Sequence, residues 1–132
     1  MPYSIASIDE LGDGYGFRKI RKPLGITAFG VNALVFPPGY EGPEHYHDRQ
    51  DELYFVHRGT ATFLIDGAEH EVGEGGLVHV ESTTPRRVSN RSEGDLILFI
   101  VGGKDGYVDR DGQLVNPEDL AKRQALSKGE VQ

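Results

Sequence analysis

The fold is decided by residues 39–59, which read GYEGPEHYHDRQDELYFVHRG. His45 and His47 lie two residues apart, so on a β-strand both imidazoles face the same side. Glu52 opens the next predicted strand after a four-residue connection, and its carboxylate can join them. Two histidines and one carboxylate suit Fe(II), and also Mn, Ni, Cu or Zn. The sequence therefore predicts a divalent-metal site formed by His45, His47 and Glu52.

Short runs rich in β-branched and aromatic residues lie on both sides of this stretch. The chain contains 18 glycines, which are spread between the runs and supply turn signals about every ten residues. Asp66-Gly67 accepts the positive φ angles of a tight hairpin turn. This pattern predicts an all-β sandwich or barrel. The predicted strands are residues 28–36, 52–56, 60–65, 68–72, 77–80, 86–89 and 96–101.

The spacing within the opening stretch resembles the first signature of the cupin superfamily, Gly-x5-His-x-His-x4-Glu-x6-Gly. Its five positions fall on Gly39, His45, His47, Glu52 and Gly59. The resemblance implies a cupin jelly-roll β-barrel, or double-stranded β-helix, built from two antiparallel sheets. It implies a single domain over residues 1–132, and it assigns the two histidines and the glutamate as metal ligands.

Residues 75–90 resemble the second cupin signature, Gly-x5-Pro-x-Gly-x2-His-x3-Asn, only in part. Gly75 and Asn90 fit the pattern. The residues that depart from it are Glu81, Thr83 and Arg86, in place of Pro, Gly and His. In the family, that histidine is the usual fourth metal ligand. Arginine stays protonated and has no acceptor atom, so Arg86 cannot bind a metal.

Arg86 leaves two arrangements open. In the first, a metal lies on the three ligands, Arg86 binds an anionic group of a small molecule, and Tyr54 donates a proton or hydrogen bond to it. This arrangement implies a metal-dependent enzyme, with the oxygenase or isomerase chemistry most typical of the family. In the second, Arg86 pairs with Glu52, and the barrel is a non-catalytic module that binds a sugar or small acid without metal.

Two further residues remain open as members of the site. His79 is an alternative fourth ligand, because it lies on a predicted strand whose inward face the sequence does not define. Asp51 could replace or assist Glu52, because related cupins vary this gap by one residue. His57 and His70 are expected on outer faces.

Composition and charge narrow the classes of function. The net charge of −7 argues against nucleic-acid binding, which needs clustered Lys and Arg. The longest apolar run, residues 96–101, is too short to span a membrane. The absence of cysteine excludes disulfides and thiolate zinc sites. Residues 1–4 resemble no secretory signal, and we expect a cytoplasmic protein.

The C-terminal part predicts a short helix over about residues 117–126, after a glycine- and aspartate-rich loop at 102–112. Asn116 can cap the helix, Pro117 suits its first position, and Glu118 and Asp119 favour the positive end of the helix dipole. Cupins of this size commonly dimerise, and pairing would cover the edges that an open jelly roll exposes. The expected partners are a second copy of the chain and a small anionic molecule.

Overall fold

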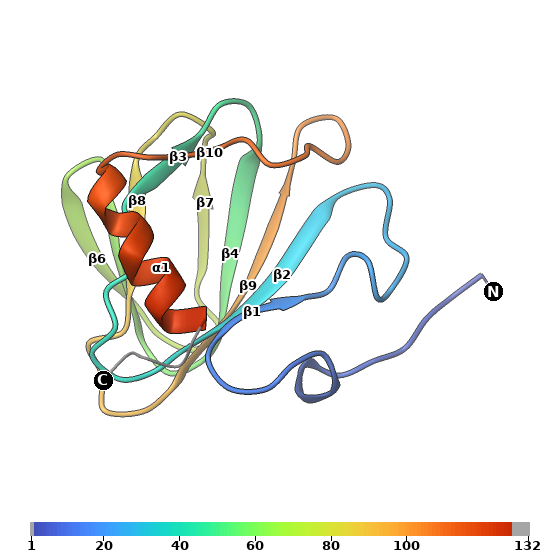
Figure 1. Ribbon diagram of the computed structural model, residues 1–132, viewed down its shortest axis with the longest axis horizontal. Helices are drawn as coiled ribbons and strands as arrows, with labels where there is room; N and C mark the ends of the chain where they lie inside the picture. The colour runs from blue at the N-terminus through green and yellow to red at the C-terminus, as the bar shows by residue number, and fades with distance from the viewer. Residues whose placement is uncertain (1, 128–132) are drawn as a thin grey trace.

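Two antiparallel sheets form the body of the molecule, as a computed structural model shows (Figure 1). The structure describes residues 2–127, so residues 1 and 128–132 of the expected domain lie outside the described residues. The strands are β1 (Gly16–Lys19), β2 (Gly30–Phe36), β3 (His45–His47), β4 (Asp51–Arg58), β5 (Ala61–Ile65), β6 (Ala68–Val72), β7 (Leu77–Val80), β8 (Arg86–Ser89), β9 (Leu96–Gly103) and β10 (Gly112–Leu114).

Each sheet contains five strands within the described residues. Sheet A has the order β1-β2-β9-β4-β7, and sheet B has the order β10-β3-β8-β5-β6. The predicted jelly roll is therefore confirmed. The predicted hairpin is β5–β6, and Asp66 and Gly67 take φ angles of 49° and 83° at its turn. Three strands lie outside the predicted ranges: β1, the short β3 that carries His45 and His47, and β10, which begins at the end of the predicted loop.

Alternation along β4 places Glu52 on the inner face of sheet A. Glu52, Tyr54 and Val56 are buried, whereas Leu53 between them is 39% exposed. Residues two apart on a strand share a face, so the inward side of β4 runs from a carboxylate to a phenol to an aliphatic side chain. The remaining core is apolar and lies between the sheets; its members include Leu34, Phe36, Phe63, Val80, Val88, Leu96, Leu98 and Ile100.

Two signature residues outside the histidine and glutamate cluster, Gly59 and Asn90, shape turns. Gly59 has a φ of 85°, and a Cβ there would lie 2.7 Å from the carbonyl oxygen of Asp95, so only glycine fits. Asn90 is fully buried and donates hydrogen bonds from Nδ2 to the carbonyls of Phe36 (3.1 Å) and Gly94 (2.8 Å). These residues shape the turns that follow β4 and β8.

The C-terminal part packs beside the barrel (Figure 1). It begins with a 3-10 turn, η2 (Pro117–Asp119), and continues as α1 (Leu120–Ser127). The Asn116 side chain accepts a hydrogen bond from the Glu118 amide at 3.1 Å, as the predicted cap requires. Leu126 reaches the core. Among residues 2–127, no helix has the length and apolar character needed to cross a membrane.

Candidate metal centre

His45, His47 and Glu52 meet between the two sheets. The histidines belong to β3 of sheet B and the glutamate to β4 of sheet A. Glu52 Oε1 lies 3.2 Å from His47 Nε2 and 3.9 Å from His45 Nε2. One nitrogen or oxygen atom of each residue lies within 4.8 Å of the others. The structure thus brings together the three residues that the sequence predicted as metal ligands.

The other ring nitrogen of each histidine faces an oxygen. His47 Nδ1 lies 2.8 Å from Asp111 Oδ1, and His45 Nδ1 lies 3.4 Å from the carbonyl oxygen of Pro43. Metal-binding histidines typically donate their distal N–H to such an oxygen, which orients the ring and leaves the other nitrogen free. His47 Nε2 is buried and has no hydrogen-bond partner among the described residues.

The donor set fits a divalent transition metal. Two imidazole nitrogens and one carboxylate oxygen suit several such ions. Atoms bonded at about 2.1 Å to one ion lie about 3.0 Å apart at right angles and about 3.4 Å apart in a tetrahedron. The separation from Glu52 Oε1 to His47 Nε2, 3.2 Å, lies in this range, and the separation to His45 Nε2, 3.9 Å, is longer.

Arg86 lies beside the cluster on β8, where it pairs in register with His45. Its side chain is fully buried, and Nη1 lies 3.8 Å from Glu52 Oε1. Nη2 donates to the carbonyl oxygens of Glu81 (2.9 Å) and Val80 (3.4 Å), whereas Nε and Nη1 have no hydrogen-bond partner within residues 2–127. A buried cation with two unpaired donors has spare capacity for an acceptor.

Tyr54 donates a hydrogen bond from its hydroxyl to Glu52 Oε1 at 2.8 Å. Burial raises the pKa of the Glu52 carboxyl, but contacts with His45, His47 and Tyr54 outweigh burial and hold that pKa well below its usual value. Burial and the Glu52 charge raise the pKa of Tyr54 far above normal. The carboxylate therefore stays ionised and the phenol stays protonated.

His47 and its second carboxylate neighbour also have shifted pKa values. Burial lowers the pKa of His47, but Glu52 and Asp111 raise it, and the net pKa shift is upward. For Asp111, burial raises the pKa, but hydrogen bonds from Gln50, His47 and Arg49 bring it down to about 2. Both carboxylates around His47 are thus negative at neutral pH.

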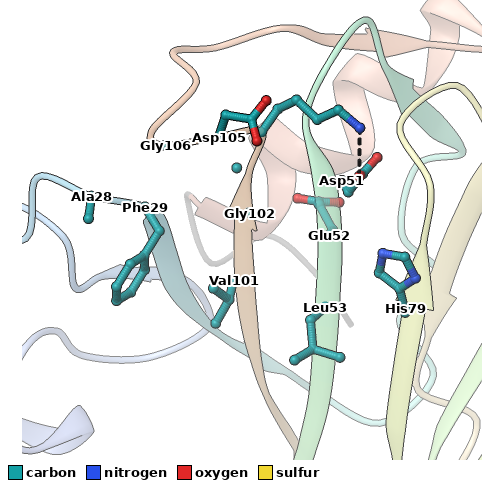
Figure 2. A pocket seen from close by; sticks show the side chains of 12 residues that line it. Ala28, Phe29, Asp51, Glu52, Leu53, His79, Val101, Gly102, Asp105 and Gly106 are labelled. Atoms are coloured by element: carbon teal, nitrogen blue, oxygen red, sulfur yellow. Dashed lines mark hydrogen bonds and ion pairs between the residues drawn. The ribbon is translucent and has the colours of Figure 1, made fainter.

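His79 and Asp51 lie away from the cluster. His79 is exposed on β7 opposite Leu53, on the outer face of sheet A. Asp51 accepts a hydrogen bond from the Ser82 amide at 2.9 Å, and its carboxylate lies 3.3 Å from Lys104 Nζ. Both residues line a groove of about 400 Å³, which Figure 2 shows with Leu53 and Val101. Neither alternative joins the cluster.

Asp111 is the site residue that sequence reasoning missed. It follows His47 by 64 positions and lies one residue before the end of the stretch predicted as a loop. Aspartate in a glycine-rich loop is typical of turns, so its residue type carried no signal of a contact with the site. Only the pairing of β10 with β3 brings it to His47.

Comparison with known proteins gives the family. Comparison with curated proteins yields no match. The chain is similar to solved structures of a cupin protein from Bacteroides fragilis (20% identity, TM-score 0.69, 83% of this chain and 91% of that chain covered) and of an uncharacterized double-stranded β-helix protein from Klebsiella pneumoniae (18%, 0.70, 83% and 89%). It is also similar to a sugar phosphate isomerase of the cupin superfamily from Silicibacter pomeroyi (21%, 0.65, 88% and 86%). The sequence model of the cupin domain matches residues 33–102, more than half of the chain, and the chain belongs to the cupin superfamily.

Proposed function

We propose that the protein binds a divalent transition-metal ion on His45, His47 and Glu52 and acts there on a small anionic organic molecule. One observation supports a metal ion bound at this site. With Nδ1–H of His47 donated to Asp111, the lone pair of Nε2 faces the ionised Glu52 oxygen at 3.2 Å. Two buried acceptors repel each other unless a positive charge lies between them. A metal ion supplies that charge, and without metal a proton does.

The net charge of the site is the reason to expect an anionic ligand. A divalent ion and the buried Arg86 guanidinium would face one carboxylate within the cluster, which leaves an excess positive charge in a desolvated place. An anionic group corrects this excess, and Nη1 of Arg86, which has no hydrogen-bond partner among the described residues, offers it a charged donor. One similar structure is described as a sugar phosphate isomerase, and a sugar phosphate is an anion of this kind.

The metal ion and the surrounding side chains have separate roles in the proposed function. The ion, when bound, supplies a Lewis acid that polarises an oxygen of the ligand, as in oxygenase or isomerase chemistry. Tyr54 holds the Glu52 carboxylate by its hydrogen bond, and Arg86 orients the anionic group. His45, with a side chain 26% exposed, is the most open member, so ligands approach from its side.

A second candidate function rests on the contact between Arg86 and Glu52. Their 3.8 Å separation places opposite charges side by side without any metal. A cupin in which this pair is retained would bind a sugar or small acid as a non-catalytic module. Metal content distinguishes this function from the first.

The test is elemental analysis of protein purified without chelator after growth with added Fe, Mn, Ni, Cu or Zn. We expect one metal per chain in the wild type and in the His70→Ala variant, whose histidine is exposed on β6. We expect loss of metal in His47→Ala. Metal-loaded protein is then assayed for oxygen consumption and isomerisation with carboxylic acids, diketones and sugar phosphates. A metal-free wild type under every supplement would leave the binding module as the function.

We also propose that the protein forms a homodimer. Support comes from sheet A, whose edge strand β7 carries Leu77 at 64% exposure and whose outer face carries the exposed Leu53. Unpaired edges and exposed apolar side chains favour association. Light scattering at tens of micromolar should give about twice the chain mass of 14.5 kDa. The mass of a single chain would contradict the proposal.

A further inference from the structure

We propose that Asp111 is a positioning residue that fixes the tautomer of His47, so that the nitrogen facing the candidate metal centre, Nε2, carries a lone pair rather than a proton. The Asp111 carboxylate has four contacts. Oδ1 lies 2.8 Å from His47 Nδ1 and 2.6 Å from Gln50 Nε2. Oδ2 lies 2.8 Å from the Arg49 amide nitrogen and 2.9 Å from the Gln50 amide nitrogen.

The surroundings of Asp111 determine the proton on His47. The two backbone amides can only donate, and an ionised carboxylate can only accept. His47 Nδ1 must therefore carry a proton to make the 2.8 Å contact favourable. The competing tautomer would donate from Nε2 to Glu52, but among the described residues Nε2 has no hydrogen bond of acceptable geometry. Neutral His47 consequently keeps its proton on Nδ1 and presents the Nε2 lone pair to Glu52 and His45.

The backbone holds Asp111 in this place from two sides. Strand β10 pairs with β3, so that Gly112 lies opposite His47, and a Cβ at Gly112 would lie 3.4 Å from His47 Cε1. The amide of Asp48 donates to the carbonyl oxygen of Asp111 at 3.1 Å. The loop before β10 is thereby closed onto the segment that carries the histidines.

Gln50 is the second support of the carboxylate. Its side-chain nitrogen, Nε2, donates to Asp111 Oδ1. Its side-chain oxygen, Oε1, lies over Gly102, where a Cβ would overlap it. Glycine at position 102 therefore makes room for the Gln50 side chain. A chain of contacts runs from Gly102 through Gln50 and Asp111 to His47, and it approaches His47 from outside the ligand set.

The substitution Asp111→Asn should reverse the tautomer. The oxygen of the introduced carboxamide would face the two backbone amides, because they can only donate. The NH2 group of that carboxamide would then face His47 Nδ1, which could only accept, and the Gln50 side-chain amide, which would turn its oxygen toward it; the His47 proton would move to Nε2. For metal binding, which rests on the proposed function, this blocks the ligand atom. Loss of such a supporting carboxylate typically weakens metal affinity by about 10- to 100-fold.

The first experiment reads the tautomer directly in metal-free protein. Two-bond ¹⁵N–¹H spectra of the His47 ring are recorded at rising pH, and the tautomer is read where the ¹⁵N shifts show a neutral ring, because the neighbouring carboxylates raise the pKa of His47. We expect Nδ1–H in the wild type and in Asp109→Asn, a control from the same loop whose carboxylate contacts Tyr107 and Arg110. We expect Nε2–H in Asp111→Asn. An unchanged His47 tautomer in Asp111→Asn overturns the inference.

Two additions keep the outcome interpretable. If Asp111→Asn does not fold, Asp111→Ala removes the acceptor at His47 Nδ1 without placing a donor there and should give a mixture of both His47 tautomers; a pure Nδ1–H form there overturns the inference. Titration with Zn²⁺ follows, in which Asp111→Asn should bind about 10- to 100-fold more weakly than the wild type and Asp109→Asn should not change. A wild type that binds no metal would sink the proposed function, while the tautomer result still decides the role of Asp111.

Discussion

The interior of the barrel has two ends of opposite character, and β4 and β9 run through both. At one end, His45, His47, Glu52 and Arg86 gather four ionisable groups. At the other, Val56 and Leu98 face each other in register among apolar side chains. Tyr54 lies between the ends: its ring packs on Phe63, with centroids 5.1 Å apart, and its hydroxyl contacts Glu52.

The ends differ most in how well their atoms are satisfied. Three of the five buried side-chain nitrogens that lack a hydrogen bond among the described residues are His47 Nε2, Arg86 Nε and Arg86 Nη1. Each costs stability, because a buried polar atom without a partner loses its contact with water. The apolar end, formed by side chains such as Val56 and Leu98, carries no such cost within residues 2–127. The fold thus rests on the apolar end, and the polar end retains unsatisfied groups that suit a ligand.

The largest expected effect comes from breaking the apolar end. Phe63→Ala removes a fully buried ring and should lower the free energy of unfolding by about 3–5 kcal/mol. Phe17→Ala, at a half-exposed position on β1, is the control and should cost much less. Urea unfolding measures both. Similar costs for the two variants would show that stability is not concentrated between the sheets.

The next effect sharpens the polar end. Arg86→His removes the buried cation and adds an imidazole beside His45, so the site gains a fourth ligand. Zn²⁺ affinity should rise by about 100-fold, or about 2.7 kcal/mol, measured by calorimetry. Arg87→His, on the opposite face of β8, is the control and should leave the affinity unchanged. Equal affinity of Arg86→His and the wild type would place position 86 outside the metal's reach.

The sequence predicted the grouping of His45, His47 and Glu52 and most strands because these follow from local spacing. The two-residue separation of His45 and His47, and the alternation from Glu52 to Val56, depend only on strand geometry. The role of Asp111 depends on a pairing across 64 positions, which spacing does not encode. The sequence did not show which face of β7 points inward, for a related reason. Only the register of Glu52 with Val80 places His79 on the outer face of the sheet.

A smaller effect tests the residue that joins the two ends. Tyr54→Phe keeps the ring contact with Phe63 but removes the hydrogen bond to the Glu52 carboxylate. We expect a loss of about 2 kcal/mol in the free energy of unfolding, because the acceptor is charged and buried. The pKa of Glu52 should rise, since this contact helps to lower it. Tyr40→Phe, whose hydroxyl donates at 3.3 Å to the neutral Lys122 carbonyl, should lose less. Equal losses would mean that the charge on Glu52 adds nothing.

The smallest effect concerns Asp119, which ties the C-terminal turn to the polar end through the Glu44 amide at 3.2 Å. Burial raises the pKa of Asp119, but that hydrogen bond and Lys122 lower it below its usual value. A depressed folded pKa stabilises the protein above the unfolded value of 3.8, and the gain is lost as pH falls through the folded pKa.

Asp119→Asn should therefore be less stable than the wild type by about 1 kcal/mol at neutral pH, and this difference should shrink as pH falls below about 4 and vanish below the folded pKa of Asp119. Unfolding in urea across this range measures the difference, with the exposed Glu118→Gln as the control. A difference that stays constant with pH would assign the contribution of Asp119 to hydrogen-bond shape rather than charge. Convergence would show that the helix is held to the polar end by ionised groups, as β3 and β4 are joined there by Glu52 and His47.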